Sequence, residues 1–326
     1  MAQAEGIRLH QTGGPEVLHF EEWEVPAPSG DEILIRHDAV GVNFIDTYQR
    51  SGLYPIPLPG GLGLEAAGTI EAIGAGVTRF RPGDRAAYCT GPVGAYATCH
   101  VVKEARAIAL PDEIKADHAA AGMLKGLTAQ YLIRQIYPVG PNDTVLFHAA
   151  AGGVGQIAVQ WLAALGATVI ATAGGAEKCA LAKRLGATHI IDYNKEDVPT
   201  RVREITNDAG VPVVFDSVGK ATWLGSLDSL KPRGLMVSFG NASGPVEGVN
   251  LGILSQKGSL FVTRPTLFHY TATTEALEAA ASDFFATLIA GDVRISDPTV
   301  YPLSEAAQAH HDLEARRTTG SLILRP

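Results

Sequence analysis

The sequence has few cysteines and no segment suited to a membrane. Its three cysteines, Cys89, Cys99 and Cys179, stand far apart, and none forms the C-x-x-C spacing of a structural metal lobe. This pattern excludes a disulfide framework and favours a reducing compartment. No run of 18 or more residues is uninterruptedly apolar, and the N-terminus lacks a basic segment followed by an apolar core. We therefore expect a cytoplasmic protein with no membrane association.

Positive charge is also scarce. Lysine and arginine total 26 against 34 aspartates and glutamates, which gives a formal net charge of −8. Surfaces that bind nucleic acids are basic, and no Lys/Arg-rich run occurs here, so we expect no nucleic-acid partner. No Ser/His/Asp arrangement or pair of carboxylates indicates a hydrolase.

An apolar strand that runs into a glycine cluster is the most informative pattern in the sequence. Residues 145–147 are apolar, and Ala150, Gly152 and Gly155 follow in the spacing of the G-x-G-x-x-G motif, with alanine at its first position. Apolar residues then recur with helical spacing as far as Gly166, which predicts a helix directly after the turn. Such a turn brings backbone N–H groups and a helix N-terminus close to a pyrophosphate. The pattern therefore predicts a dinucleotide-binding site.

Short apolar strands and helices alternate beyond this turn. Strands are predicted at residues 167–172, at the end of 186–193, at 213–216 and at 235–239, and helices at 176–185 and 223–230. This alternation is typical of a parallel, doubly wound sheet in an α/β fold. The ligand of such a sheet binds at the carboxyl ends of its strands.

The end of the second strand indicates which dinucleotide is bound. An NAD site usually places an acidic residue there, but this strand ends in Thr172-Ala173-Gly174-Gly175. Lys178 begins the next helix, where its charge would meet an added phosphate, and Tyr193 ends the following strand. The sequence favours NADPH over NADH. The alternative, an ordinary solvated lysine partly offset by Glu177, stays open.

The N-terminal region has a different pattern. Short pieces rich in β-branched residues, at 32–37, 68–74 and 84–88, are separated by glycine and proline turns, which is typical of a β-barrel-like domain. Two helices are predicted after it, at 116–123 and 127–136. A strand at 320–324 is expected to return to this first domain.

Several motifs resemble the medium-chain dehydrogenase/reductase superfamily, and within it the zeta-crystallin-like branch of NADPH:quinone oxidoreductases. The motifs lie at residues 41–55, 63–68, 125–128, 148–155, 215–219 and 235–241. The resemblance implies a GroES-like catalytic domain over residues 1–125, completed by 266–326, and a Rossmann domain that binds NADPH over 126–265.

The resemblance also bears on metal. Zinc-dependent members of the superfamily place a cysteine where this chain has Asn43 and a histidine where it has Leu64. Asparagine is a poor zinc ligand and leucine is none, so we expect no metal. Without a Lewis acid, the reaction needs an acceptor that takes up electrons readily, such as a quinone or an activated alkene.

The family pattern implies which residues form the site. The expected catalytic residues lie in a cleft between the domains and are Asn43, Asp46, Tyr48 and Tyr54. Asn43 or a tyrosine hydroxyl would hydrogen-bond the acceptor oxygen as charge develops there. In the alternative interpretation, Asn43 and Asp46 only satisfy backbone groups in a turn, and both tyrosines are core residues with exposed hydroxyls.

The expected cofactor contacts are carried over position by position. They are Asn43, Thr128, Tyr131, Gly152, Gly153, Val154, Gly174, Lys178, Tyr193, Ser217, Phe239, Gly240, Asn241, Arg264 and Arg316. Of these, Gly152 to Val154 would meet the pyrophosphate, and Phe239 to Asn241 the nicotinamide.

These observations predict an NADPH-dependent reductase of quinones or other small electrophilic acceptors. An enoyl or alkenal reductase is the nearest alternative, and a non-catalytic nucleotide-binding protein, crystallin-like or RNA-binding, is the alternative of another class. Residues 259–264 are predicted to form the last strand of the sheet. In this family that edge pairs across a two-fold axis, so we expect a homodimer.

Overall fold

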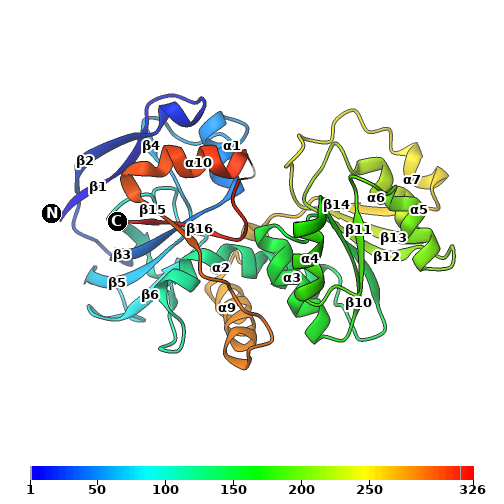
Figure 1. Ribbon diagram of the computed structural model, residues 1–326. Helices are drawn as coiled ribbons and strands as arrows, with labels where there is room; N and C mark the ends of the chain where they lie inside the picture. The colour runs from blue at the N-terminus through cyan, green and yellow to red at the C-terminus, as the bar shows by residue number, and fades with distance from the viewer. Residues whose placement is uncertain (1, 316) are drawn as a thin grey trace. The chain divides into compact units, whose positions relative to one another are not determined.

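The computed structural model describes residues 2–315 and 317–326, so the predicted cofactor contact Arg316 lies outside the described residues. The chain divides into two compact units (Figure 1). Unit 1 comprises Met1–Leu127, Thr271–Ile289 and Ile295–Pro326, and unit 2 comprises Thr128–Tyr270 and Ala290–Arg294.

Unit 2 is built on a six-stranded parallel sheet. Its strands, in spatial order, are β11 (His189–Asp192), β10 (Thr168–Ala173), β9 (Thr144–Phe147), β12 (Val211–Asp216), β13 (Leu230–Ser238) and β14 (Phe261–Thr263). All five neighbouring pairs are parallel. This is the strand order of a Rossmann fold, in which the order reverses between β9 and β12 and ligands bind at that point. The predicted doubly wound sheet is confirmed.

Helices cover both faces of this sheet. Their bounds are α3 (Gly153–Ala164), α4 (Ala176–Arg184), α5 (Val198–Ile205), α6 (Trp223–Ser229), α7 (Gly252–Gln256) and α8 (Leu267–Tyr270). In Figure 1, α3 and α4 lie on one side of the strands and α5 and α6 on the other. The sequence prediction missed α5, although Asp197 caps it by accepting from Thr200 N at 3.1 Å and Pro199 stands in its first turn.

Unit 1 consists mainly of antiparallel strands. One sheet has the order β2 (His19–Val25), β1 (Ala2–Leu9), β4 (Gly60–Gly61). The other has the order β15 (Thr299–Pro302), β16 (Leu322–Arg325), β3 (Glu32–Val42), β5 (Ala66–Ile73), β6 (Arg85–Tyr88), β8 (Ile108–Ala109), and β7 (Cys99–Lys103) pairs with β3. The core between them is formed by aliphatic and aromatic side chains such as Ile33, Ile35 and Tyr88. Strand β16 pairs with β3, so the C-terminal strand does return to the first domain.

The helices of unit 1 include α1 (Phe44–Ser51), α9 (Thr274–Ala290) and α10 (Ala306–Glu314), and three short 3₁₀ turns lie at Pro15–Val17, Glu104–Arg106 and Leu303–Glu305. A long helix, α2 (Ala116–Gln130), runs on into a π-helical turn at Tyr131–Ile136. Among the described residues, no helix is long and apolar enough to cross a membrane.

The continuity of α2 corrects the prediction of two helices over 116–136. The two predicted helices end at residue 123 and begin again at Leu127, with Gly126 between them. In the structure, Gly126 faces the ring of Phe284, and a Cβ at this position would lie 2.3 Å from the nearest ring atom. The glycine is therefore explained by packing rather than by a helix end.

This packing predicts a stability change. Gly126→Ala should destabilise the protein by about 1 to 3 kcal/mol, because the ring of Phe284 has to move. Gly225→Ala in α6 is the matched control. Its Cβ would lie 3.5 Å from the nearest atom, so this variant should match or exceed the wild type in stability. Urea unfolding of the three proteins measures both effects. Equal stability of Gly126→Ala and the wild type would show that Phe284 does not constrain this position.

Candidate active site

The glycine turn of unit 2 lies between the end of β9 and the start of α3. Gly152 is the N-cap of α3, and the first N–H groups of this helix have no carbonyl before them in the helix. A Cβ at Gly155 would lie 2.4 Å from the Ala149 carbonyl oxygen, so only glycine fits. Ala149 itself adopts a left-handed conformation, with φ of 53°. The turn therefore offers the backbone donors that a pyrophosphate needs, and it fits the predicted dinucleotide.

A buried polar network holds the strand ends beneath this turn. The His148 Nδ1 atom lies 3.0 Å from Thr172 Oγ1, and its Nε2 atom lies 3.1 Å from Ser226 Oγ. The Ser226 hydroxyl donates to Asp216 Oδ2 at 2.7 Å. Ser226 therefore accepts from His148 Nε2–H, and Thr172 donates to Nδ1. The network ties together the ends of β9, β10 and β12.

This network is structural, although it contains a serine, a histidine and an aspartate. The hydroxyl proton of Ser226 points to Asp216, so His148 is not placed to remove it. All three side chains are at most 2% exposed. Burial lowers the pKa of His148, so the ring stays neutral at physiological pH.

Two of the residues predicted at the adenosine phosphate meet at the end of β10. A Cβ on Gly174 would lie 2.5 Å from the Tyr193 hydroxyl oxygen, so the tyrosine lies against this glycine. Lys178 is partly exposed in the first turn of α4, which begins just after Gly175. The sequence interpretation overlooked Asp192 at the end of β11, which accepts from Gly175 N at 2.9 Å. This acid orients the loop before α4.

The residues predicted near the nicotinamide also share one edge of the sheet. Phe239 N donates to the Asp216 carbonyl at 2.8 Å, and a Cβ at Gly240 would lie 2.3 Å from the Ser217 carbonyl oxygen. The loops after β12 and β13 therefore pack directly on each other. Because all six strands are parallel, the turn after β9 and these two loops lie at the same, carboxyl edge.

Three other predicted cofactor contacts of unit 2 lie near its first and last segments. Tyr131 stacks on Tyr270 with ring centroids 4.7 Å apart. Arg264 follows β14 and donates from Nη1 to the Ser238 carbonyl at 3.0 Å. Burial raises the pKa of the Tyr131 hydroxyl, and the nearby Arg264 opposes that shift. Thr128, the first residue of unit 2, is buried in α2.

The four predicted catalytic residues of unit 1 gather around α1. Asn43 is the N-cap of the helix, and its backbone N–H donates to Asp46 Oδ2 at 2.8 Å. The rings of Tyr48 and Tyr54 meet edge to face, with centroids 5.4 Å apart. Both tyrosines are partly exposed, whereas Asn43 and Asp46 are buried.

A buried carboxylate that the sequence interpretation missed sets the orientation of Asn43. Glu65 is fully buried, and its Oε2 accepts from Asn43 Nδ2 at 2.8 Å while its Oε1 accepts from Leu124 N at 2.5 Å. Lys125 Nζ lies 3.8 Å from Glu65 Oε2. Burial raises the pKa of Glu65 and lowers the pKa of Lys125, while each opposes the shift of the other. An acidic residue inside an apolar segment, Leu64-Glu65-Ala66-Ala67, was the sequence signal.

The two positions where zinc-dependent relatives carry ligands hold side chains unsuited to metal. Asn43 is engaged with Glu65, and Leu64 is 1% exposed in the apolar interior. Among the described residues, no group of three or more histidine, cysteine, aspartate or glutamate side chains could hold a metal ion. All three cysteines are free thiols.

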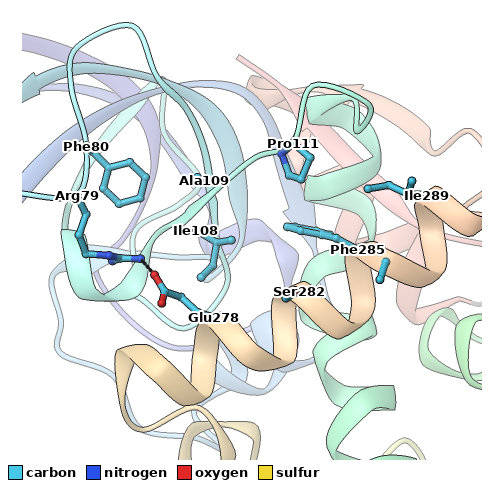
Figure 2. A pocket seen from close by; sticks show the side chains of 10 residues that line it. Arg79, Phe80, Ile108, Ala109, Pro111, Glu278, Ser282, Phe285 and Ile289 are labelled. Atoms are coloured by element: carbon cyan, nitrogen blue, oxygen red, sulfur yellow. Dashed lines mark hydrogen bonds and ion pairs between the residues drawn. The ribbon is translucent and has the colours of Figure 1, made fainter.

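Unit 1 also has a pocket that contains none of the predicted site residues. Figure 2 shows that it lies along one side of α9, with Phe285 and Ile289 facing Ile108 and Pro111. Its volume is about 610 Å³, and an ion pair between Arg79 and Glu278 closes one end. The pocket is separate from the candidate site around α1.

Comparison with known proteins places the chain in a class. Residues 29–136 match the alcohol dehydrogenase GroES-like domain, and residues 153–287 match the zinc-binding dehydrogenase family. The chain is thus a GroES-like and Rossmann protein of the dehydrogenase type. It is 56% identical to a quinone oxidoreductase of Pseudomonas aeruginosa, over 99% of this chain and all of that protein. It is 43% identical to a 2-haloacrylate reductase of a Burkholderia species, over 98% of each chain.

Comparison with solved structures agrees with this classification. The structure of a Pseudomonas syringae quinone oxidoreductase superimposes with a TM-score of 0.98 at 55% identity, covering 99% of this chain and all of that one. The structure of an Escherichia coli quinone oxidoreductase complexed with NADPH gives a TM-score of 0.97 at 49% identity, covering both chains completely. The chain belongs to the quinone oxidoreductase family, and the predicted resemblance is confirmed.

The position of Lys178 predicts a cofactor preference. Lys178→Ala should weaken NADPH binding about 5- to 30-fold, because a charge-assisted hydrogen bond to the added phosphate is lost. NADH binding should not change, since NADH lacks this phosphate. Lys183→Ala, in the last turn of the same helix, is the control and should bind both nucleotides like the wild type. Fluorescence titration measures these constants. Unchanged NADPH affinity in Lys178→Ala would rule out the phosphate contact.

Proposed function

We propose that this protein oxidises NADPH and reduces a quinone, without a metal ion. The observation that carries the proposal is the full-length similarity to a quinone oxidoreductase whose structure holds NADPH. The glycine turn, the strand edge and the Gly174–Tyr193 contact in this chain fit that cofactor. Bound NADPH would supply a hydride, and a quinone that takes up the hydride and one proton becomes a hydroquinone.

The geometry around Asn43 restricts its role. Its Nδ2 group donates to Glu65, and its Oδ1 atom has no hydrogen-bond partner among the described residues. Asn43 therefore presents an acceptor, which suits the N–H₂ group of a nicotinamide carboxamide better than the carbonyl oxygen of a quinone. This favours the predicted cofactor contact over stabilisation of the acceptor oxygen.

Tyr48 and Tyr54 are then the candidates for the acceptor oxygen. Each carries a hydroxyl that can donate, and their rings support each other at the end of α1. A hydrogen bond directed at an oxygen on which negative charge develops lowers the barrier to reduction. The protein thus contributes position and hydrogen bonds, while the quinone contributes its own electron affinity.

An assay of NADPH oxidation tests this function. With a simple benzoquinone, the loss of NADPH absorbance should be saturable in both substrates, and NADPH should be preferred to NADH. Tyr54→Phe should lower kcat/KM for the quinone about 10-fold and leave NADPH binding unchanged, because it removes one hydroxyl donor. Tight NADPH binding without turnover of any quinone or enone would instead support a non-catalytic protein.

Reduction of an activated alkene is a second candidate. It is favoured by the similarity to a 2-haloacrylate reductase over nearly the whole chain. The same assay distinguishes the two functions if 2-chloroacrylate or a simple enone replaces the quinone. A larger kcat/KM for the alkene would assign the protein to that reaction.

A homodimer is proposed from the edge of the unit 2 sheet. Strand β14 ends the sheet, and Phe261 on it is 61% exposed. Pairing of two such edges across a two-fold axis would cover this apolar surface.

Cytoplasmic localisation is proposed as well, and the three free thiols support it.

Light scattering tests the dimer. The wild type should have twice the mass of one chain, and Phe261→Asp should shift it towards the mass of a monomer, because the charge opposes pairing. Leu224→Asp on α6 is the control, since Leu224 is 56% exposed and α6 packs against β12 and β13, and it should leave the mass unchanged. A monomeric wild type would refute the proposal.

A further inference from the structure

A chain of buried polar side chains lies behind Asp46, and the function described so far does not use it. It joins α1 to α10, which lie beside each other in unit 1 (Figure 1). Arg50, Tyr96 and His310 are each at most 3% exposed. Polar groups this deeply buried are costly unless their hydrogen bonds are made, so their arrangement needs a reason.

The contacts form an unbroken series. Arg50 Nη1 lies 3.1 Å from His310 Nδ1, and His310 Nε2 lies 2.9 Å from the Tyr96 hydroxyl oxygen. The Tyr96 hydroxyl lies 2.9 Å from Asp46 Oδ2. At the other end, Arg50 Nη2 donates at 2.8 Å to Glu314, whose side chain is 38% exposed. The series therefore runs from the surface to the carboxyl group of Asp46.

The direction of every hydrogen bond in this series is determined. An arginine can only donate, so His310 Nδ1 accepts and the neutral ring carries its proton on Nε2. His310 then donates to the Tyr96 oxygen, which leaves the Tyr96 proton to be donated to Asp46. Burial, and secondarily the charge of Arg50, lowers the pKa of His310 to about 3, so the ring stays neutral and the direction does not reverse.

This direction distinguishes the two oxygens of Asp46. Oδ2 accepts from both the Tyr96 hydroxyl and the Asn43 backbone N–H, so a proton on the carboxyl group has to reside on Oδ1. Asp46 Oδ1 has no partner among the described residues, and neither have Asn43 Oδ1 and Gln49 Oε1. These three positions are spaced by three residues, from the N-cap of α1 to its last turn, and lie on one face of the helix. A water or ligand donor is needed to satisfy them.

We propose that Asp46 holds, on Oδ1, the proton that each reduction consumes, and that Tyr96, His310 and Arg50 are positioning residues that keep its carboxyl group aligned. The proposal rests on the quinone reductase function. In the step, the quinone gains a hydride from NADPH and becomes a hydroquinone anion. The O–H bond of Asp46 breaks, and an O–H bond forms on that anion through a water at Oδ1. Asp46 is left ionised and regains a proton from solvent.

The surroundings of Asp46 suit this task. Glu65 before β5 and Lys125 on α2 act on it with opposite charges, and Tyr96 donates to it. Arg50 on its own helix and His310 and Glu314 on α10 lie further along the series. Burial is the largest influence and raises the pKa of Asp46 to about 7, although the two hydrogen bonds to Oδ2 oppose it. The carboxyl group can therefore gain and lose a proton near neutral pH.

The pH profile of quinone reduction tests the proposal. A group that must be protonated predicts that kcat falls as the pH rises through about 7. This decrease of kcat above pH 7 is the alkaline limb of the profile. Asp46→Asn, which keeps the size and accepts the same hydrogen bonds, should lower kcat by about 10²-fold and abolish this limb. Tyr96→Phe removes a donor to the carboxylate, so the limb should move upward by about one pH unit.

Tyr88→Phe is the matched control. Tyr88 is another fully buried tyrosine of unit 1, and its hydroxyl contacts His37 and His100 rather than Asp46. It should lose similar stability to Tyr96→Phe without moving the limb. The proposal is wrong if Tyr96→Phe leaves the limb in place as Tyr88→Phe does, or if Asp46→Asn retains the limb. In either case, quinone reduction by the wild type still establishes the function. Failure of the wild type to reduce quinones would overturn the function itself.

A measurement without turnover completes the test. Infrared titration of the protein without nucleotide should show a protonated carboxyl band that disappears with a midpoint near pH 7 in the wild type. This titration should be missing in Asp46→Asn and shifted upward in Tyr96→Phe. The same titration in Asp46→Asn as in the wild type would assign the proton to another group and overturn the proposal.

Discussion

The carboxylate of Glu65 is the interaction on which the candidate site of unit 1 depends. It lies in the apolar interior, and its two oxygens accept from the amide of Asn43 and the backbone of α2. Gly41 of β3 makes room for it, because a Cβ there would lie 2.4 Å from Glu65 Oε2. A charge in this position is tolerated only because donors and Lys125 surround it. One side chain thereby fixes the relative position of a strand, the start of α1 and the middle of α2.

Unit 2 also has a buried carboxylate that organises its candidate site, at the carboxyl edge of its sheet. Asp216 ends β12, and its Oδ1 accepts from the backbone of Val218 and Gly219 while its Oδ2 accepts from Thr222 and Ser226. An acceptor with four donors holds the loop after β12 in one conformation. His148 extends the network to β9 and β10. In both units, therefore, a buried acid positions the backbone segments that carry the predicted contacts.

The features that could be predicted from the sequence are those that depend on residues close together in the chain. The glycine turn, the alternation of strands and helices and the acid-free end of β10 are local patterns, since each needs only neighbouring residues to be recognised. The reason for a glycine at position 126 inside α2 is the ring of Phe284, which is far away in the chain. Partners such as Tyr96 and His310 are likewise brought to Asp46 only by tertiary packing. Residues 43 to 54 were found through family resemblance, because their spacing alone does not indicate chemistry.

The buried pair of Glu65 and Lys125 also bears on which electron acceptor the protein can reduce. In zinc-dependent relatives, a cation at the ligand positions polarises the substrate oxygen, but here those positions hold Asn43 and Leu64. Lys125 is a buried cation on α2, and its charge is balanced by Glu65 at 3.8 Å. The local field therefore stabilises little negative charge on a bound substrate. An unactivated ketone would need such stabilisation, whereas a quinone already accepts a hydride readily and needs only alignment and a proton. The absence of zinc ligands at positions 43 and 64 therefore fits an acceptor that is easily reduced.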